Sequence, residues 1–163
     1  CEGAIMAATD EFTISLKGKG AHAAMPHLGN DPTVLGSQIV NALQTIVSRT
    51  SSPFEPVVVS VTKFNAGTAR NVIPDTAEIA GTIRSMSAEG REMAISRLKA
   101  IAEGLCNTHN AECHIHLHEG YTVTFNHSAE PRKAVEIAKS VAGENKVDAN
   151  YLPTMGGEDF SYK

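Results

Sequence analysis

The sequence lacks long hydrophobic runs, an excess of basic charge and a rich supply of aromatic residues. None of its apolar stretches approaches the roughly 18 residues that a membrane-spanning helix requires. The net charge is -4, and aromatic residues make up 5% of the 163 residues. A nucleic-acid surface would need a basic face with exposed stacking rings. We therefore expect no membrane span and no nucleic-acid partner, and we look for small molecules or protein partners.

Cysteine is also scarce. The three cysteines, Cys1, Cys106 and Cys113, are an odd number without the spacing of a disulfide framework. Reduced thiols and a cytoplasmic location are therefore expected. Because the chain opens on Cys1 and stops shortly after a glycine-rich motif, we expect a fragment of a longer protein. Hydrophobic residues at 42% and charged residues at 20% indicate a globular chain that buries a core.

Hydrophobic periodicity predicts an alternation of strands and helices over the first two thirds of the chain. Asp31 followed by Pro32, and Ser87 later, are typical helix starts. Pro74 should turn the beginning of its strand into an edge or a bulge. The predicted order is strand, helix, strand, strand, helix, strand, at residues 12–17, 32–49, 57–64, 72–84, 88–106 and 112–118.

This order is that of the ferredoxin-like split βαβ fold, an α+β architecture. It predicts a four-stranded antiparallel sheet over residues 10–118, with both helices on one face and the first and third strands in the centre. The strand at 57–64 is then an apolar edge. Such an edge is either an aggregation hazard or an interface.

The pattern changes after Glu119. A short extended piece at 121–125 precedes a helix that we expect to be capped by Ser128 and to end at Gly143. No partner core for this part is evident in the sequence. Residues 119–163 are therefore interpreted as a partial α/β segment, the beginning of an incomplete second domain.

Three segments combine turn-forming and polar residues in an unusual way: GKGAHAAMPH at 18–27, RNVIPD at 70–75 and MGGEDF at 155–160. Together they look like parts of one active site. Each has a plainer alternative: His22 can be a surface loop residue, and Asn71 a turn-former. Arg84, at a strand end, can be an ordinary exposed charge.

With GTIRS at 81–85 and TMGGEDFS at 154–161, these motifs resemble the metal-dependent amidohydrolases and peptidases related to aminoacylase, hippurate hydrolase and glutamate carboxypeptidase. The GGEDF variant looks closest to the hippurate hydrolase branch. The resemblance implies a lid, or dimerisation, domain at 10–118 and an incomplete C-terminal part of the metal-binding catalytic domain at 119–163. It also implies a hydrolase of amide bonds in N-acyl amino acids or related small conjugates.

The resemblance further implies roles for individual residues. His22 would donate a hydrogen bond to the oxyanion in the active site of the other subunit. Asn71 and Arg84 would hold the substrate, because a guanidinium fork suits a carboxylate. Gly156 and Gly157 would form a loop whose bare backbone lets the substrate approach closely.

His27 and Glu158 are weaker candidates. His27 could support the site or only cap the following loop, and Glu158 could orient the glycine loop. Neither is expected to bind a metal.

The metal itself is expected elsewhere. The resemblance implies a divalent ion, zinc, manganese or cobalt, in the full-length parent, with ligands outside this chain. His114, His116 and His118 share one strand face, but they lie in a line, roughly 7 Å apart, and cannot readily converge on one ion. The chain alone is therefore expected to be inactive.

Assembly follows from the same resemblance. We expect a homodimer through the strand at 57–64 and the helix at 31–49, and a small N-acyl amino acid as substrate. The alternative is a free-standing ferredoxin-like dimerisation or ligand-binding module without catalysis.

Overall fold

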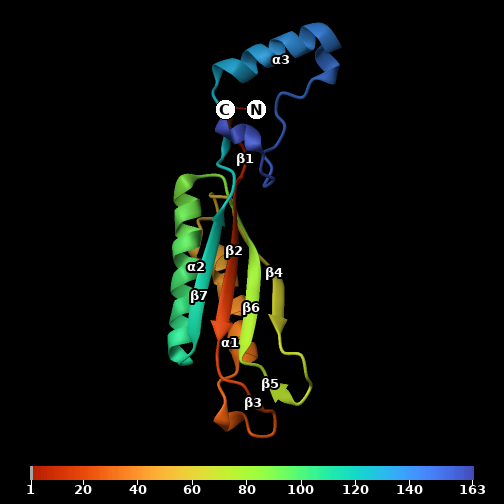
Figure 1. The fold of residues 1–163 in the computed structure, drawn as a ribbon. Helices are drawn as coiled ribbons and strands as arrows, with labels where there is room; N and C mark the ends of the chain where they lie inside the picture. Colours follow the sequence, from red (N-terminus) through yellow and green to blue (C-terminus); the bar gives the residue numbers. More distant parts are fainter. Residues whose placement is uncertain (1) are drawn as a thin grey trace.

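Four long strands form the centre of the molecule. The computed structural model describes residues 2–163 and arranges the strands as an antiparallel sheet in the order β4-β6-β2-β7 (Figure 1). The predicted first and third strands are central, and both β4 and β7 are edges. The strands are β2 (Ala8–Lys17), β4 (Val57–Ala66), β6 (Thr76–Ser85) and β7 (Glu112–Glu119).

Two long helices, α1 (Pro32–Thr45) and α2 (Ala88–Thr108), connect these strands. Asp31 and Ser87 cap them as predicted: the Asp31 carboxylate accepts the backbone N–H of Thr33 at 2.8 Å, and the Ser87 hydroxyl accepts that of Gly90 at 2.9 Å. A wider π-helical turn, Ile46–Thr50, follows α1. The chain therefore stays helical to about the residue where the sequence predicted the helix to end.

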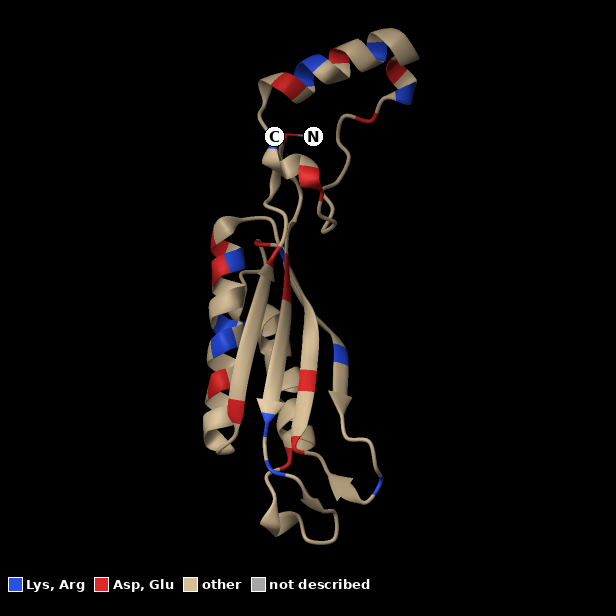
Figure 2. Ribbon diagram, in the orientation of Figure 1, with Lys and Arg blue, Asp and Glu red and all other residues tan. Residues whose placement is uncertain are grey.

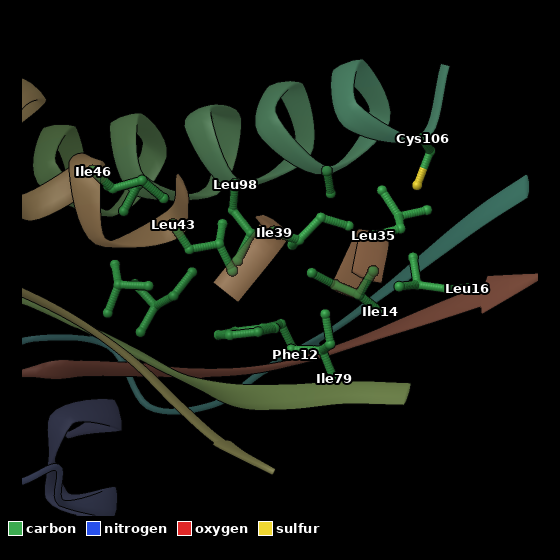
Figure 3. Close-up of a cluster of buried hydrophobic side chains, with 14 of the residues drawn as sticks. Phe12, Ile14, Leu16, Leu35, Ile39, Leu43, Ile46, Ile79, Leu98 and Cys106 are labelled. Carbon is green, nitrogen blue, oxygen red and sulfur yellow. The ribbon is translucent and has the colours of Figure 1, made fainter. Parts of the chain in front are cut away.

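Both helices pack on the same face of the sheet, as the predicted fold requires (Figure 3). Their apolar stripes meet the inward side chains of β2 and β6, and the buried set forms one continuous core. Fully buried members are Phe12, Ile14, Leu16, Leu35, Ile39, Leu43, Ile46, Ile79, Ile83 and Leu98. The other face of the sheet is not covered by a helix (Figure 1).

β2 begins at Ala8, earlier than the predicted start at Phe12. Asp10 interrupts the apolar alternation that the prediction relied on, since its side chain faces the helices and is 2% exposed. Arg91 of α2 makes this possible with a bidentate contact, Nε to Oδ2 at 2.7 Å and a terminal nitrogen to Oδ1 at 2.6 Å. These hydrogen bonds with Asp10 raise the pKa of the Arg91 guanidinium.

Pro74 splits the predicted strand at 72–84 in two. The short strand β5 (Val72–Ile73) separates from β6 and pairs instead with β3 (Ala21–His22). Below the main sheet in Figure 1, this small ribbon joins two loops that are far apart in the sequence.

The remaining residues form a separate extension. β8 (Thr124–Asn126) pairs with β1 (Gly3–Met6), and α3 (Ala129–Ala142) follows. β1 gives β8 a strand partner that the sequence did not reveal, but α3 has no buried residue. Ser128 is also not the predicted cap: its backbone is already helical and its side chain accepts no hydrogen bond from the helix. Gly143, with φ of 93°, ends α3 as expected.

Charged residues of both signs alternate along α2 and α3 (Figure 2). Such a mixture is ordinary for solvated helix faces. Cys106 and Cys113 are free thiols, as expected, and Cys1 lies outside the described residues. Within residues 2–163, every helix is too short or too polar to span a bilayer.

Candidate functional site

One group of candidate residues lies on the small β3/β5 ribbon, which we call the tip. His22 pairs with Val72 across this ribbon, and the next residue, Ala23, donates its N–H to the carbonyl of Asn71 at 3.0 Å. The first two predicted motifs are therefore hydrogen-bonded to each other. His22 and Asn71 are brought together although 49 positions separate them in the sequence.

The ring of His22 is held by its own loop. The backbone N–H of Ala24 donates to Nδ1 at 3.1 Å. Because Nδ1 accepts a hydrogen bond, the neutral ring carries its proton on Nε2, and the residue as a whole is exposed. His22 can thus donate outward. His27 is exposed in the same loop, within a short 3-10 helix (Pro26–Leu28).

Asp75 ties the two loops of the tip together. Its carbonyl accepts the N–H of Gly18 at 2.8 Å, and its carboxylate accepts the N–H of Gly20 at 2.8 Å. A Cβ at Gly20 would come within 2.8 Å of the Ile73 carbonyl. Glycine at this position therefore allows the close approach of the two backbones.

A second group lies at the opposite end of the sheet, which we call the junction. Arg84 pairs with Thr9 of β2 and Val58 of β4. Its side chain therefore lies on the face of the sheet that no helix covers, which we call the open face. The glycine loop reaches the same end, since Ala7 donates its N–H to the Gly156 carbonyl at 2.9 Å. Arg84 and the GGEDF motif are therefore near neighbours.

Glu158 caps the turn that follows the glycine loop. Its carboxylate accepts the N–H of Asp159 at 3.0 Å, at the start of a 3-10 helix (Asp159–Tyr162). The hydroxyl of Tyr162 then donates to the carbonyl of Gly120 at 3.0 Å. A part for Glu158 in orienting the glycine loop stays a prediction.

The tip and the junction do not meet within one copy of the chain. The strand between Thr76 and Arg84 is roughly 26 Å long at about 3.3 Å per residue, and the tip lies beyond its first end. A small substrate cannot contact His22 and Arg84 of the same copy. The motifs predict one active site for the three segments and, by resemblance, place His22 in the site of the other subunit; the distance within one copy is compatible with that prediction.

The described residues do not fit a metal site. Among residues 2–163, no three His, Cys, Asp or Glu side chains are placed to hold an ion. His114, His116 and His118 are all exposed on the open face of the edge strand β7, opposite Ser15, Thr13 and Glu11.

Each end of the lid also has a cavity. At the junction, a cavity of about 650 Å³ lies between the start of α2 and the aromatic rings of Tyr121, Phe125 and Tyr162. At the tip, one of about 590 Å³ is lined by both loops, including Ala21, Val72 and Asp75. Neither is lined by His22, Arg84 or Gly157, so cavity shape alone would not have identified the candidate residues.

Sequence reasoning missed Thr9, Asp10 and Arg91, which anchor the junction end of the sheet. A signal for the ion pair was present. Asp10 occupies a core-facing position of the β2 alternation, and Arg91 lies in the first turn of α2, the second long helix. A buried carboxylate of this kind requires a cationic partner.

These features define an α+β unit, and the candidate residues lie in two groups at its two ends. Comparison with known proteins gives the family: the model of the peptidase dimerisation domain of the M20 family matches residues 9–110, and the chain belongs to this family.

Relatives with assigned activities cover almost the whole chain. N-acetyldiaminopimelate deacetylase of Ligilactobacillus salivarius is 40% identical over 163 residues, which are 99% of this chain and 42% of that protein. Hippurate hydrolase of Campylobacter jejuni is 35% identical over 161 residues, which are 99% of this chain and 42% of that protein.

A solved structure agrees with this assignment. The dinuclear metal-binding peptidase of the M20 family from Bacillus subtilis has a TM-score of 0.74 and 30% sequence identity, covering 99% of this chain and 39% of that one. The homologues are thus M20 amidohydrolases and peptidases. The chain spans about two fifths of the length of these relatives.

Proposed function

We propose that the chain is part of a longer metal-dependent amidohydrolase that cleaves the amide bond of N-acyl amino acids or related small conjugates. Residues 10–118 would be its dimerisation lid, and residues 119–163 would belong to the catalytic domain. The family assignment and the hydrolase relatives support this proposal. A free-standing module is disfavoured because apolar residues of the extension, such as Val141 and Leu152, are about four fifths exposed.

The observation that carries the proposal is the separation of the tip from the junction. A two-fold axis between antiparallel β4 edges would continue the sheet into a second lid. The two lids would then point in opposite directions, so that the tip of one lies toward the junction end of the other. His22 and Asn71 of one subunit could in this way serve the same substrate as Arg84 of its partner.

The surface available for such a dimer is apolar. β4 has one unpaired edge, and Phe64, Val34 and Val47 nearby are 38%, 49% and 40% exposed. An exposed apolar edge of this length is a hazard unless it is covered. We therefore propose a homodimer through β4 and α1.

In this proposal, the residues of this chain bind the substrate and stabilise the negative charge that develops during the reaction. Hydrolysis of an amide develops negative charge on the carbonyl oxygen. The outward Nε2–H of His22 would donate to that oxygen, Arg84 would pair with the free carboxylate of the substrate, and Asn71 would position it. The glycine loop, Gly156 and Gly157, would pass close to the substrate backbone.

The divalent metal, zinc, manganese or cobalt, would be held by residues of the longer protein outside this chain, and it would supply an activated water. The free thiols Cys106 and Cys113 support a cytoplasmic location.

The test uses the longer protein. His22→Ala should lower kcat by about 100-fold or more, because one oxyanion donor is lost, while metal content and folding stay unchanged. His116→Ala, an exposed histidine on β7, is the matched control and should be active. Unchanged turnover in His22→Ala would show that the GKGAHAAMPH segment is only a structural turn.

Mixed dimers distinguish action in trans. A His22→Ala subunit paired with a subunit lacking a metal ligand should regain activity in one of its two sites. Failure of this complementation, with normal dimer formation, would place His22 in the site of its own subunit.

A further inference from the structure

Thr9 joins β2 to the chain that leaves β7 through both its backbone and its side chain. It is 8% exposed, and all of its polar groups are bonded to the chain that leaves β7. Its N–H donates to the carbonyl of Tyr121, its carbonyl accepts the N–H of Gly120, and its hydroxyl oxygen accepts the N–H of Tyr121, each at 2.9 Å. The bond from Tyr121 to the hydroxyl oxygen favours the rotamer that the Thr9 side chain adopts.

The methyl group of Thr9 is directed at Gly157. A Cβ at Gly157 would lie 2.1 Å from this methyl carbon and 3.2 Å from the Tyr121 ring. Gly157 is not among the described glycines with positive φ, so backbone strain does not explain the missing side chain. The space is filled by Thr9. By contrast, a Cβ at Gly156 would meet only ordinary contacts, the nearest at 3.6 Å.

Thr9 also adjoins Arg84. The two residues are directly opposite in the β2–β6 register and share the open face. The neighbouring residue Ala7 is bonded to the Gly156 carbonyl at 2.9 Å. Thr9 therefore lies between the guanidinium-bearing strand and the glycine loop.

We propose that Thr9 is a positioning residue that sets the glycine loop against Arg84, and that Gly157 is glycine because the Thr9 methyl occupies the space of a side chain. This inference rests on the proposed function, in which the loop and Arg84 contact one substrate. In this inference, position 157 lacks a side chain because Thr9 fills the space. The family resemblance attributes the same glycine to close approach of the substrate.

The two reasons are separated by one pair of substitutions. Thr9→Ser removes the methyl group but keeps the hydroxyl oxygen that accepts from Tyr121. If the Thr9 methyl group is what excludes a side chain at position 157, Thr9→Ser should restore the properties that Gly157→Ala loses. If the substrate excludes that side chain instead, Thr9→Ser should not restore them.

The first measurement uses the 163-residue chain and does not depend on catalysis. Gly157→Ala should speed amide hydrogen exchange at Gly120 and Tyr121, whose N–H groups bond to Thr9, by about tenfold. The double variant should restore slow exchange. Gly156→Ala is the matched control and should leave both amides unchanged. Unchanged exchange in Gly157→Ala, or no restoration in the double variant, would overturn the contact.

The second measurement uses the longer protein. Gly157→Ala should raise KM by about tenfold or more, since the loop is displaced from Arg84, and the double variant should return it to near the original value. Gly104→Ala, where a Cβ meets nothing within 4 Å, is the control for activity. Restored exchange without restored KM would overturn the positioning role.

If the longer protein without substitutions does not hydrolyse amides, the proposed function and the catalytic part of this inference are both wrong. The exchange data would then still establish or refute the contact between Thr9 and Gly157.

Discussion

The lid and the C-terminal extension differ in how they bury their apolar residues. In the lid, both helices and the central strands share one core, whose members Ile39 and Leu98 are fully buried. In the extension, α3 has no buried residue, and Ile137 and Val141 are 54% and 83% exposed. Both regions have regular secondary structure. Among residues 2–163, the buried apolar core cluster lies in the lid, and α3 contributes no residue to it; such packing is what normally stabilises helices.

The difference indicates two kinds of stability within one chain. The lid should unfold cooperatively as a unit, whereas α3 should open locally. We expect the apolar face of α3 to be covered in the longer protein.

Hydrogen exchange should show the largest contrast. Amides in the middle of β2 and β6 should exchange about a thousandfold or more slowly than those of α3, because only their opening requires global unfolding. Exchange of the 163-residue chain followed by NMR measures this directly. Comparable protection in α3 would show that the extension is stabilised by contacts that its exposure does not suggest.

Substitutions in matched helices should reproduce the contrast at single positions. Leu98→Ala in α2 should lower the free energy of unfolding by about 3 kcal/mol, from lost burial and the resulting cavity. Ile137→Ala in α3 should change it by less than about 0.5 kcal/mol. Urea denaturation of both variants gives the values, and a similar cost at the two sites would remove the distinction.

The stability of the lid should depend on the charge of Arg91, which pairs with the buried Asp10. Arg91→Ala leaves the buried Asp10 carboxylate unpaired and should cost about 2–3 kcal/mol. Lys139 of α3 also lies beside an acidic residue, Glu144, at 3.6 Å, but that carboxylate is 82% exposed. Lys139→Ala, the control, should cost less than about 0.5 kcal/mol. Denaturation curves that coincide for the two variants would contradict this prediction.

The smallest effect concerns pH. Burial raises the pKa of the Cys106 thiol from 9.0 to about 12. The unfolded chain therefore loses this proton at lower pH than the folded lid does. The contribution of Cys106 to stability is complete below pH 9 and is lost as the pH rises from 9 toward 12.

Unfolding of the original chain and of Cys106→Ala, measured between pH 8 and 11, should show a steeper alkaline decline for the original chain. Parallel curves would indicate that the thiol ionises equally easily in both states. Burial also raises the pKa of the Cys113 thiol, so Cys113→Ala should reduce the alkaline decline as well.

Much of the lid was predictable because its signals are local. The apolar repeats at Leu35, Ile39 and Leu43 and the caps Asp31 and Ser87 lie within a few positions of the structure they specify. The strand order then follows from the ferredoxin-like pattern. The candidate site residues came from motifs, and their roles remain predictions.

The errors lie where the deciding partner is distant. β1 was missed because its partner β8 follows about 120 residues later. The start of β2 was misplaced because Asp10 is tolerated only beside Arg91. Ser128 resembles a helix cap in sequence, but its backbone is already helical.

The sequence by itself determined the identity and order of the lid elements, since burial periodicity and capping are properties of neighbouring residues. Only the tertiary structure decided that His22 and Arg84 lie at opposite ends of the sheet, and that the methyl of Thr9 fills the space beside Gly157. These placements depend on strand register and on contacts between residues about 50 or more positions apart. Such contacts form only when the whole lid packs, so no local pattern encodes them.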